Sequence, residues 1–578
     1  MPAANPTRSV FFFGVIVLGI VLLYVGYINH YALNIPISDD YDLVRVKYTL
    51  LTQELSGWEQ LKLLLEPEND HRILFPRLVA LGFYAWEGFI NYRTLIFFVN
   101  ACLLGLLLVW GLSFRRQGLS HWYLLPVLLW YLNPFLYDVT LWGINGMQHT
   151  MLNLLVFSSL YVLSYFQKKG TLLVGLVLAL MATFTNGNGF LVFPAGLAML
   201  LVAREWGKSA VWSAGMLVAL GGYFFNYKAG QATQVDFTAE FIRNVAISFG
   251  ALSAGWVEAF GADPGTLIWL SFGLGYLTLL LIVLGLALLL FPVTTFSARS
   301  GPYFWVGVLV FSALTIGIIA VSRGGRDLFS VFTSRYSLYP IHLLTLVYVI
   351  VLAVVRRGPQ RVIFVGALLF GLLFVAESYF QYAKGRDVRY RNLVADHFNW
   401  RQHRRLVTHF RSDLADFFTL DAYQRGIYRM SDFPLVGAER AMRARWSSTI
   451  HEVPLALTTQ TDSIRFFGTP QQITQFTLDN TTLPDQNRGY YLVLKSHSGA
   501  TYLLPTWPTP GGRKRFFTAG EVYKPGFTVT SYTENFRPGT YRIGLLTGQP
   551  GKYQVQSTSY ALQVDSTSAS LRIQPLSP

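Results

Sequence analysis

Long apolar runs separated by short polar loops make up the chain as far as residue 379. A transmembrane helix needs about 20 apolar residues, so we expect apolar flanks to extend the shorter runs. The pattern predicts a polytopic α-helical membrane protein with about eleven transmembrane helices. The first run is too long for a signal peptide and lacks a small-residue cleavage site, so we expect it to be retained. The runs lie at 10–28, 94–113, 122–137, 150–166, 171–184, 190–202, 210–225, 266–291, 303–321, 339–355 and 362–379.

The character of the chain changes after residue 379. Residues 1–385 are the predicted transmembrane domain, 386–445 a polar, basic helical connector, and 446–578 a β-rich domain. In the last part, short alternating runs with Gly and Pro between them are typical of a β-sandwich. Two amphipathic stretches, 71–89 and 237–260, are expected to lie on the outer face of the membrane without crossing it.

Composition agrees with this class of protein. Of the 578 residues, 52% are hydrophobic and only 13% are charged, whereas soluble proteins carry about 25% charged residues. The single cysteine, Cys102, excludes a disulfide framework within one chain and a cysteine-based metal site. The chain shows no nucleic-acid motif, so we expect its net charge of +15 to face anionic membrane lipids and not nucleic acid.

The distribution of Lys and Arg predicts the orientation. If the N-terminus is cytoplasmic, the cytoplasmic loops contain one acid, Glu205, and the first outer loop, 30–92, is rich in acids. This arrangement requires an odd number of spans and places the C-terminal domain outside the cytoplasm. The basic cytoplasmic residues are Arg8, Arg115, Arg116, Lys168, Lys169, Arg204, Lys208, Arg299, Arg356, Arg357 and Arg361.

The acidic segment "SDDYD" follows the first apolar run and contains Asp39, Asp40 and Asp42. One interpretation is helix capping, with Ser38 as the N-cap and the acids in the first turn. The other is a reaction centre, because further charged clusters are predicted at the same outer rim. "ENDHR" contains His71 and Arg72, and the segment 322–340 contains Arg323, Arg326 and Arg335.

Carboxylates facing arginines at a membrane surface suit sugar transfer from a polyprenyl phosphate. A carboxylate takes the proton of the attacking acceptor hydroxyl. Arginines stabilise the phosphate that departs with the lipid, because the guanidinium matches phosphate oxygens and stays charged. Phosphate leaves without being protonated, so one carboxylate suffices, whereas glycoside hydrolases normally need two.

Four motifs resemble those of bacterial membrane glycosyltransferases of the GT-C superfamily: "DD" after the first span, "HRILFPRL", "FTNGNGFLVFPAGL" and "GR...SRY". The resemblance covers roughly the first 380 residues and implies inverting transfer, at the outer face of the bacterial inner membrane, to a glycan or lipid acceptor. It implies that Asp39 or Asp40 is the catalytic base and that Arg335 or Arg326 binds the phosphate. Some relatives use a D-x-D pair, here Asp40 and Asp42, in a metal site. No second metal-binding motif follows, so a divalent cation is not expected.

Several other outer-loop residues are candidates for the sugar site or the phosphate site. Each has a structural alternative: a tight turn for the "NGNG" segment, interfacial anchoring for the second outer loop, and a surface position for His71. The candidates for donor phosphate are Arg335, Arg326, Arg323, Arg72 and His71, and those for substrate are Asp42, Asp138, Asn145, Gln148, Asn186 and Asn188.

Two other functions compete with that of an enzyme. A transporter or flippase for a lipid-linked sugar usually shows internal repeats and polar groups at mid-membrane depth. The apolar runs here are nearly free of charged residues, and no repeat is present. A passive anchor for the β-rich domain would need one span and not eleven.

Overall fold

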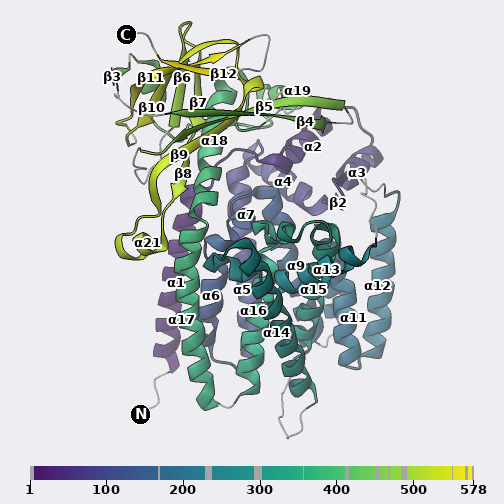
Figure 1. The fold of residues 1–578 in the computed structure, drawn as a ribbon. Helices are drawn as coiled ribbons and strands as arrows, with labels where there is room; N and C mark the ends of the chain where they lie inside the picture. The colour runs from purple at the N-terminus through teal and green to yellow at the C-terminus, as the bar shows by residue number, and fades with distance from the viewer. Residues whose placement is uncertain are drawn as a thin grey trace. The chain divides into compact units, whose positions relative to one another are not determined.

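The computed structural model (Figure 1) divides into two compact units: Met1–Ala32 with Pro36–Gln381, and Leu33–Ile35 with Tyr382–Pro578. The structure describes residues 6–166, 169–227, 237–291, 302–355, 357–409, 416–430, 433–444, 446–449, 455–466, 469–482, 491–549, 551–565 and 571–575. Three of the basic residues used to predict the orientation, Lys168, Arg299 and Arg356, lie outside these ranges.

The first unit is a helical bundle. Its helices are α1 (Pro6–Tyr31), α2 (Tyr41–Thr52), α3 (Gly57–Leu65), α4 (Leu74–Glu87), α5 (Tyr92–Arg116), α6 (Leu125–Tyr131), α7 (Tyr137–Thr140), α8 (Gly143–Gly146), α9 (Leu152–Tyr165), α10 (Lys169–Thr183), α11 (Val192–Val202), α12 (Trp206–Phe224), α13 (Ala239–Ser253), α14 (Pro264–Leu290), α15 (Tyr303–Ile319), α16 (Leu338–Val354) and α17 (Arg357–Gln381). Two short strands, β1 (Pro67–Glu68) and β2 (His71–Arg72), form a hairpin.

Six helical segments within the described residues are long and apolar enough to cross a membrane, which supports a membrane-embedded protein. They are Arg8–Tyr31, Tyr92–Arg116, Pro264–Leu290, Tyr303–Gly324, Ser334–Val354 and Gly358–Gln381. The other five predicted runs form shorter or less apolar helices. For example, the run 122–137 yields only α6, because the chain leaves the helix at Leu132 and Pro134 starts a new turn.

Helix boundaries follow local capping chemistry. The Asn91 side chain accepts the N–H of Arg93 (3.1 Å) at the start of α5, and the Asp263 side chain accepts the N–H of Thr266 (3.0 Å) at the start of α14. Such oxygens satisfy the free N–H groups of a first helical turn. Helix α14 packs closely on α13: a Cβ on Gly275 would lie 1.8 Å from the carbonyl oxygen of Gly250. Glycine is therefore required at Gly275 for this contact.

Polar side chains inside the bundle hydrogen-bond to one another. The Trp110 indole donates to the Tyr131 hydroxyl (3.1 Å), which lies 2.6 Å from His342 Nδ1, and His342 Nε2 lies 3.0 Å from Asn153 Oδ1. This chain connects α5, α6, α16 and α9. Because buried polar groups in a membrane have no water to bind, mutual hydrogen bonds hold these helices in one arrangement.

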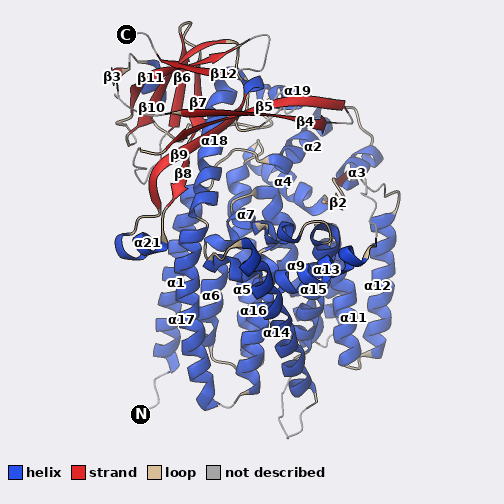
Figure 2. Ribbon diagram, viewed as in Figure 1, coloured by secondary structure: helices blue, strands red, loops and turns tan. Residues whose placement is uncertain are grey.

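The second unit contains most of the strands (Figure 2) and confirms the predicted β-rich C-terminal domain. One sheet has the order β12-β11-β10-β6-β7, with β3 beside β11, and the other has the order β4-β5-β9-β8. Leu478 of β5, Leu492 of β6, Ile543 of β10 and Phe398 of α18 are buried in one shared core. The elements are α18 (Ala383–His403), α19 (Asp416–Gln424), α20 (Ala438–Arg443), α21 (Arg513–Ala519), β3 (Ser447–Thr449), β4 (Ala456–Phe466), β5 (Thr469–Asn480), β6 (Tyr491–Ser496), β7 (Thr501–Pro505), β8 (Trp507–Pro510), β9 (Tyr523–Tyr532), β10 (Gly539–Thr547), β11 (Gln554–Val564) and β12 (Leu571–Pro575).

Candidate functional site

The acidic segment forms a single 3-10 turn, Ser38–Asp40, that leads into α2. Ser38 has a φ of +45° and does not cap this turn, so the predicted capping role of Ser38 is wrong. The Asp40 side chain supplies the hydrogen bond at the start of this turn instead, because its Oδ2 accepts the N–H of Ile37 (3.0 Å). A positive φ is unusual for serine, and such strained residues cluster at functional sites.

Asp40 is engaged on both carboxylate oxygens. Oδ2 accepts the N–H of Ile37, and Oδ1 accepts the N–H of Ile144 at the start of α8 (2.9 Å). The Tyr92 hydroxyl donates to the Asp40 carbonyl (2.8 Å). Asp40 is 1% exposed. These contacts tie the first outer loop to α5 and α8, which indicates a structural role for this side chain.

Asp42 forms a buried ion pair with Arg77 of α4. The Arg77 guanidinium donates from Nε to Asp42 Oδ2 (2.8 Å) and from Nη2 to Oδ1 (3.0 Å), and Arg45 Nη2 donates to the same Oδ1 (2.7 Å). Burial raises the pKa of Asp42, but the hydrogen bonds and charges of Arg77 and Arg45 outweigh it and hold that pKa below its ordinary value. Arg77 Nη1 also donates to the carbonyls of three residues: Leu63, Leu64 and Glu66.

Glu68 joins the acidic residues from the β1–β2 hairpin. Asn69 has a φ of +51°, which Asn tolerates in a tight turn, so Glu68 and His71 stand opposite each other. Burial, followed by the neighbouring carboxylates of Asp42 and Asp39, raises the pKa of Glu68 to about 8. Glu68 was not among the site residues predicted from the sequence. The sequence signal that could have indicated Glu68 is the segment "ENDH", in which Glu68 lies three residues before His71 and Asn69 favours a tight turn.

Because the pKa of Glu68 is raised, we expect the stability of the fold to depend on the protonation of this side chain. The glutamate binds a proton more tightly in the folded than in the unfolded state, so its protonation stabilises the fold at low pH. This contribution is present below about pH 4.5, falls between that pH and about 8, and is lost above it. We expect Glu68→Gln to raise the unfolding temperature at pH 9 relative to wild type and to have less effect at pH 5, as measured by thermal unfolding in detergent. An equal effect of the substitution at both pH values would contradict a raised pKa.

His71 lies near charges from distant parts of the chain. Loss of hydration around the ring lowers the pKa of His71. The adjacent Asp70 opposes that shift most strongly, Arg323 adds to it, and Asp39 opposes it with a smaller effect. The ring packs on the "NGNG" segment, since a Cβ on Gly187 would lie 2.3 Å from His71 Nδ1. The charges of an acid from the start of the chain and of an arginine beyond its midpoint therefore both act on His71.

Asp39 is half-buried and less constrained than its neighbours. In the described part of the chain, its one side-chain hydrogen bond comes from the Ser38 hydroxyl to Oδ1 (3.2 Å). The charge of Asp39 acts on both Glu68 and His71. Of the three aspartates in this segment, Asp39 is therefore the one whose carboxylate is not bound by backbone amides or arginines.

Arg335 lies over the Trp142 ring, and its neighbour Ser334 binds Asp138. The Arg335 guanidinium carbon is 5.8 Å from the centre of the Trp142 ring. Trp142 immediately precedes the Gly143–Gly146 turn whose Ile144 amide holds Asp40. The Ser334 hydroxyl donates to Asp138. The charges of Arg335 and His71 both act on His149, so the two predicted phosphate-binding residues share a neighbour.

The side-chain amides that were predicted to bind sugar mainly form hydrogen bonds that stabilise loops. Asn145 Nδ2 donates to the Asp138 carbonyl (2.9 Å), Asn186 Nδ2 to the Gln148 carbonyl (3.3 Å), and Asn188 Nδ2 to the Tyr339 hydroxyl (3.0 Å). Asn188 Oδ1 is buried without a hydrogen-bond partner among the described residues.

The remaining arginines differ in their surroundings. Arg72 donates from Nη1 to the Leu65 carbonyl (2.6 Å) and from Nη2 to the Phe225 carbonyl (2.7 Å), which supports a structural role. Arg323 and Arg326 are exposed on the turn after α15. Among the described residues, no group of three or more His, Cys, Asp or Glu side chains is arranged to hold a metal ion.

An apolar groove of about 760 Å³ runs between α13, α14 and α15. One of its lining residues, Ser322, directly precedes the exposed Arg323 in the chain. The groove is lined by Ile242, Val245, Ala246, Phe249, Tyr276, Ala313, Leu314, Gly317, Ile318, Val321 and Ser322.

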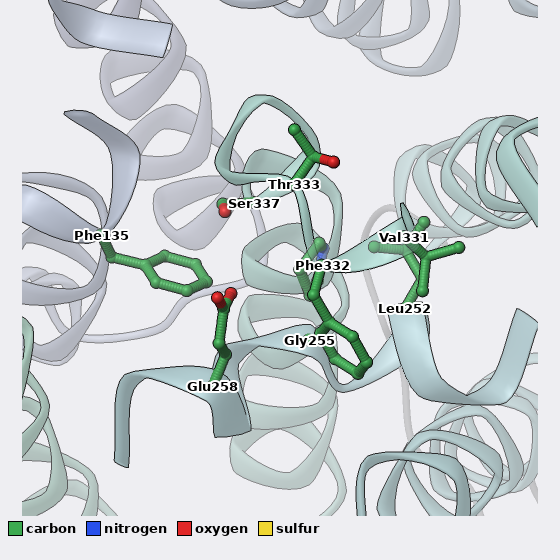
Figure 3. Close-up of a pocket in the computed structure, with 9 residues that line it drawn as sticks. Phe135, Leu252, Gly255, Glu258, Val331, Phe332, Thr333 and Ser337 are labelled. Carbon is green, nitrogen blue, oxygen red and sulfur yellow. The ribbon is translucent and has the colours of Figure 1, made fainter. Parts of the chain in front are cut away.

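A second pocket is far smaller (Figure 3). The Phe135 ring and the Glu258 carboxyl group extend toward it, and Val331 and Leu252 close the other side. Its volume of about 10 Å³ accommodates no more than one water molecule. This pocket is too small for a sugar.

No protein-family model matches the chain, and it matches neither a curated protein nor a solved structure.

Proposed function

We propose that this protein is an inverting membrane glycosyltransferase. It transfers a sugar from a polyprenyl-phosphate donor to a hydroxyl group of a glycan or lipid acceptor at the outer face of the bacterial inner membrane. In this topology the N-terminus is cytoplasmic and the C-terminal domain is outside. The observation that supports the proposal is that the charges of Asp39 and Arg323 both act on His71, and that Arg323 directly follows Ser322, a lining residue of the apolar groove.

Asp39 is the proposed base. Its carboxylate takes the proton of the acceptor hydroxyl as that oxygen attacks the anomeric carbon from the face opposite the phosphate. The bond between the anomeric carbon and the phosphate oxygen breaks, and its electron pair leaves with the lipid phosphate. The configuration at the anomeric carbon is therefore inverted. Asp40 and Asp42 are proposed to position the loop, because backbone amides and arginines occupy their carboxylates.

Cations stabilise the departing phosphate in this proposal. Arg323 is exposed next to the groove and near His71, and Arg335 is half-buried over Trp142. The negative charge on the phosphate grows as the glycosidic bond breaks, so a fixed guanidinium binds the transition state more strongly than the substrate. Arg326 is a further cation on the same loop.

The assay that tests this function uses the purified full-length chain and a panel of undecaprenyl-phosphate sugars. Transfer to an acceptor with inversion at the anomeric carbon supports the proposal. Transfer with retention would contradict the single-displacement step. Movement of the lipid-linked sugar across vesicles without transfer would instead support the transporter alternative.

A substitution in the apolar groove tests whether the groove binds the lipid chain of the donor. A Cβ added to Gly317 would lie 3.9 Å from its nearest neighbour, the Phe249 ring, so a larger side chain there fills the groove without a clash with the backbone. We expect Gly317→Leu to raise KM for a long-chain donor about tenfold, with a much smaller change in kcat, because it displaces several methylene contacts. A donor with a short prenyl chain should be affected less.

The matched control is Gly366→Leu. Gly366 lies on α17 and has open space around it, but it does not line the groove. This control should leave KM for both donors unchanged. If Gly317→Leu affects long and short donors equally, the groove does not hold the lipid chain.

A further inference from the structure

Helix α21 is a small projection on the second unit that the fold itself does not require. It lies between β8 and β9, which pair as Pro510↔Tyr523 and Thr509↔Lys524 next to it. None of its seven residues is buried. Substitutions on its surface therefore leave the hydrophobic core of the unit untouched.

The surface of α21 combines cations with aromatic side chains. Arg513, Lys514 and Arg515 open the helix, and Phe516 and Phe517 follow them. The Phe517 side chain is 53% exposed, and the two phenyl rings lie 5.1 Å apart. Exposing a large aromatic side chain to water is unfavourable, so a partner that covers it gains free energy.

Hydrogen bonds and a glycine cap hold α21 at its two ends. The Gly511 amide donates to the Val522 carbonyl (2.8 Å), and Gly520 ends the helix with a φ of +69°, which suits glycine. Arg515 forms an ion pair with Glu521 across the helix end. A helix of this length is not stable by itself in water. The hairpin and the glycine cap therefore present its cations and rings in a fixed arrangement.

We propose that α21 docks on a bilayer that contains anionic phospholipid. Lysine and arginine near such a surface are attracted to its negative charge, and phenylalanine inserts at the boundary between headgroups and acyl chains. The hairpin end has four cations, the three that open α21 and Lys524, against one acid, Glu521. The six apolar helices of the same chain hold this unit close to a bilayer, which raises the effective concentration of the lipid surface.

The test places a fluorescent probe on α21 in the full-length chain. Cys102 is the only native cysteine and is buried, so Ala519→Cys introduces one reactive site at an exposed position. The labelled protein is reconstituted in nanodiscs of phosphatidylcholine alone or of an equal mixture with phosphatidylglycerol. With phosphatidylglycerol, we expect quenching by aqueous iodide to fall about fivefold and quenching by nitroxide-labelled lipid to rise. High salt should reverse both effects.

Two controls define the result. A probe at Ser498→Cys, in the exposed turn between β6 and β7 of the same unit, should stay accessible to iodide in both lipid mixtures. In the Ala519→Cys background, Phe517→Ser and a triple substitution of Arg513, Lys514 and Arg515 by Gln should each restore iodide quenching. The proposal is overturned if the Ala519 probe is equally accessible in both mixtures, as it would be if α21 bound a protein or a polysaccharide instead.

Discussion

Asp39→Asn is expected to reduce sugar transfer by about 10²- to 10⁴-fold, the range that a general base contributes. The amide keeps the size of the carboxylate but cannot accept the proton of the acceptor hydroxyl. Asp39 is half-buried, and its one side-chain hydrogen bond in the described part of the chain comes from Ser38, so the fold should tolerate the change. The measurement is kcat for transfer with the best donor, together with the unfolding temperature. Asp39→Glu should recover part of the activity, because it restores a base.

Asp40→Asn and Asp263→Asn are the controls. Asp263 is an exposed N-cap outside the acidic segment, so its substitution should leave turnover unchanged. Asp40→Asn keeps one accepting oxygen but places a donating NH2 against the second backbone amide, so it should lower the unfolding temperature. Normal turnover in Asp39→Asn, together with a loss of turnover and full stability in Asp40→Asn, would assign the base to Asp40. Normal turnover in both variants would show that neither Asp39 nor Asp40 acts in catalysis.

Arg77→Met is expected to destabilise the first unit by about 3–5 kcal/mol, as is usual when one partner of a buried ion pair is removed. The Arg77 side chain is 0% exposed and that of Asp42 is 2% exposed. Without Arg77, Arg45 is the one described cation that still binds Asp42, and the carbonyls of Leu63, Leu64 and Glu66 lose the hydrogen bonds that Arg77 donates. The measurement is the free energy or temperature of unfolding in detergent at pH 7.

Arg45→Met is the matched control. Its side chain is 34% exposed and binds the same carboxylate, so its loss should cost about 1 kcal/mol or less. The double variant Asp42→Asn/Arg77→Met removes both buried charges and should be more stable than Arg77→Met alone. If Arg77→Met and Arg45→Met are equally mild, the buried pair does not hold this loop in place.

The apolar periodicity predicted much of the first unit. The runs 10–28, 94–113, 266–291, 303–321, 339–355 and 362–379 all coincide with helices long enough to span a membrane. Length and apolarity are properties of a continuous segment, so they are visible in the sequence. The run 122–137 was also predicted to span the membrane, but its helix ends at Tyr131, before Pro134. Apolarity alone does not predict such a break.

Composition and periodicity were enough to predict apolar helices long enough to span a membrane, a β-rich C-terminal domain, and acids and arginines that flank the apolar segments. These properties depend on composition and on periods of a few residues. Only the tertiary structure separated the three neighbouring aspartates, because their partners lie far along the chain. Asp42 binds Arg77, Asp40 binds the Ile144 amide, and Asp39 shares the neighbourhood of His71 with Arg323. A carboxylate becomes a structural acceptor or stays available for chemistry according to the donors packed around it, and packing sets those donors.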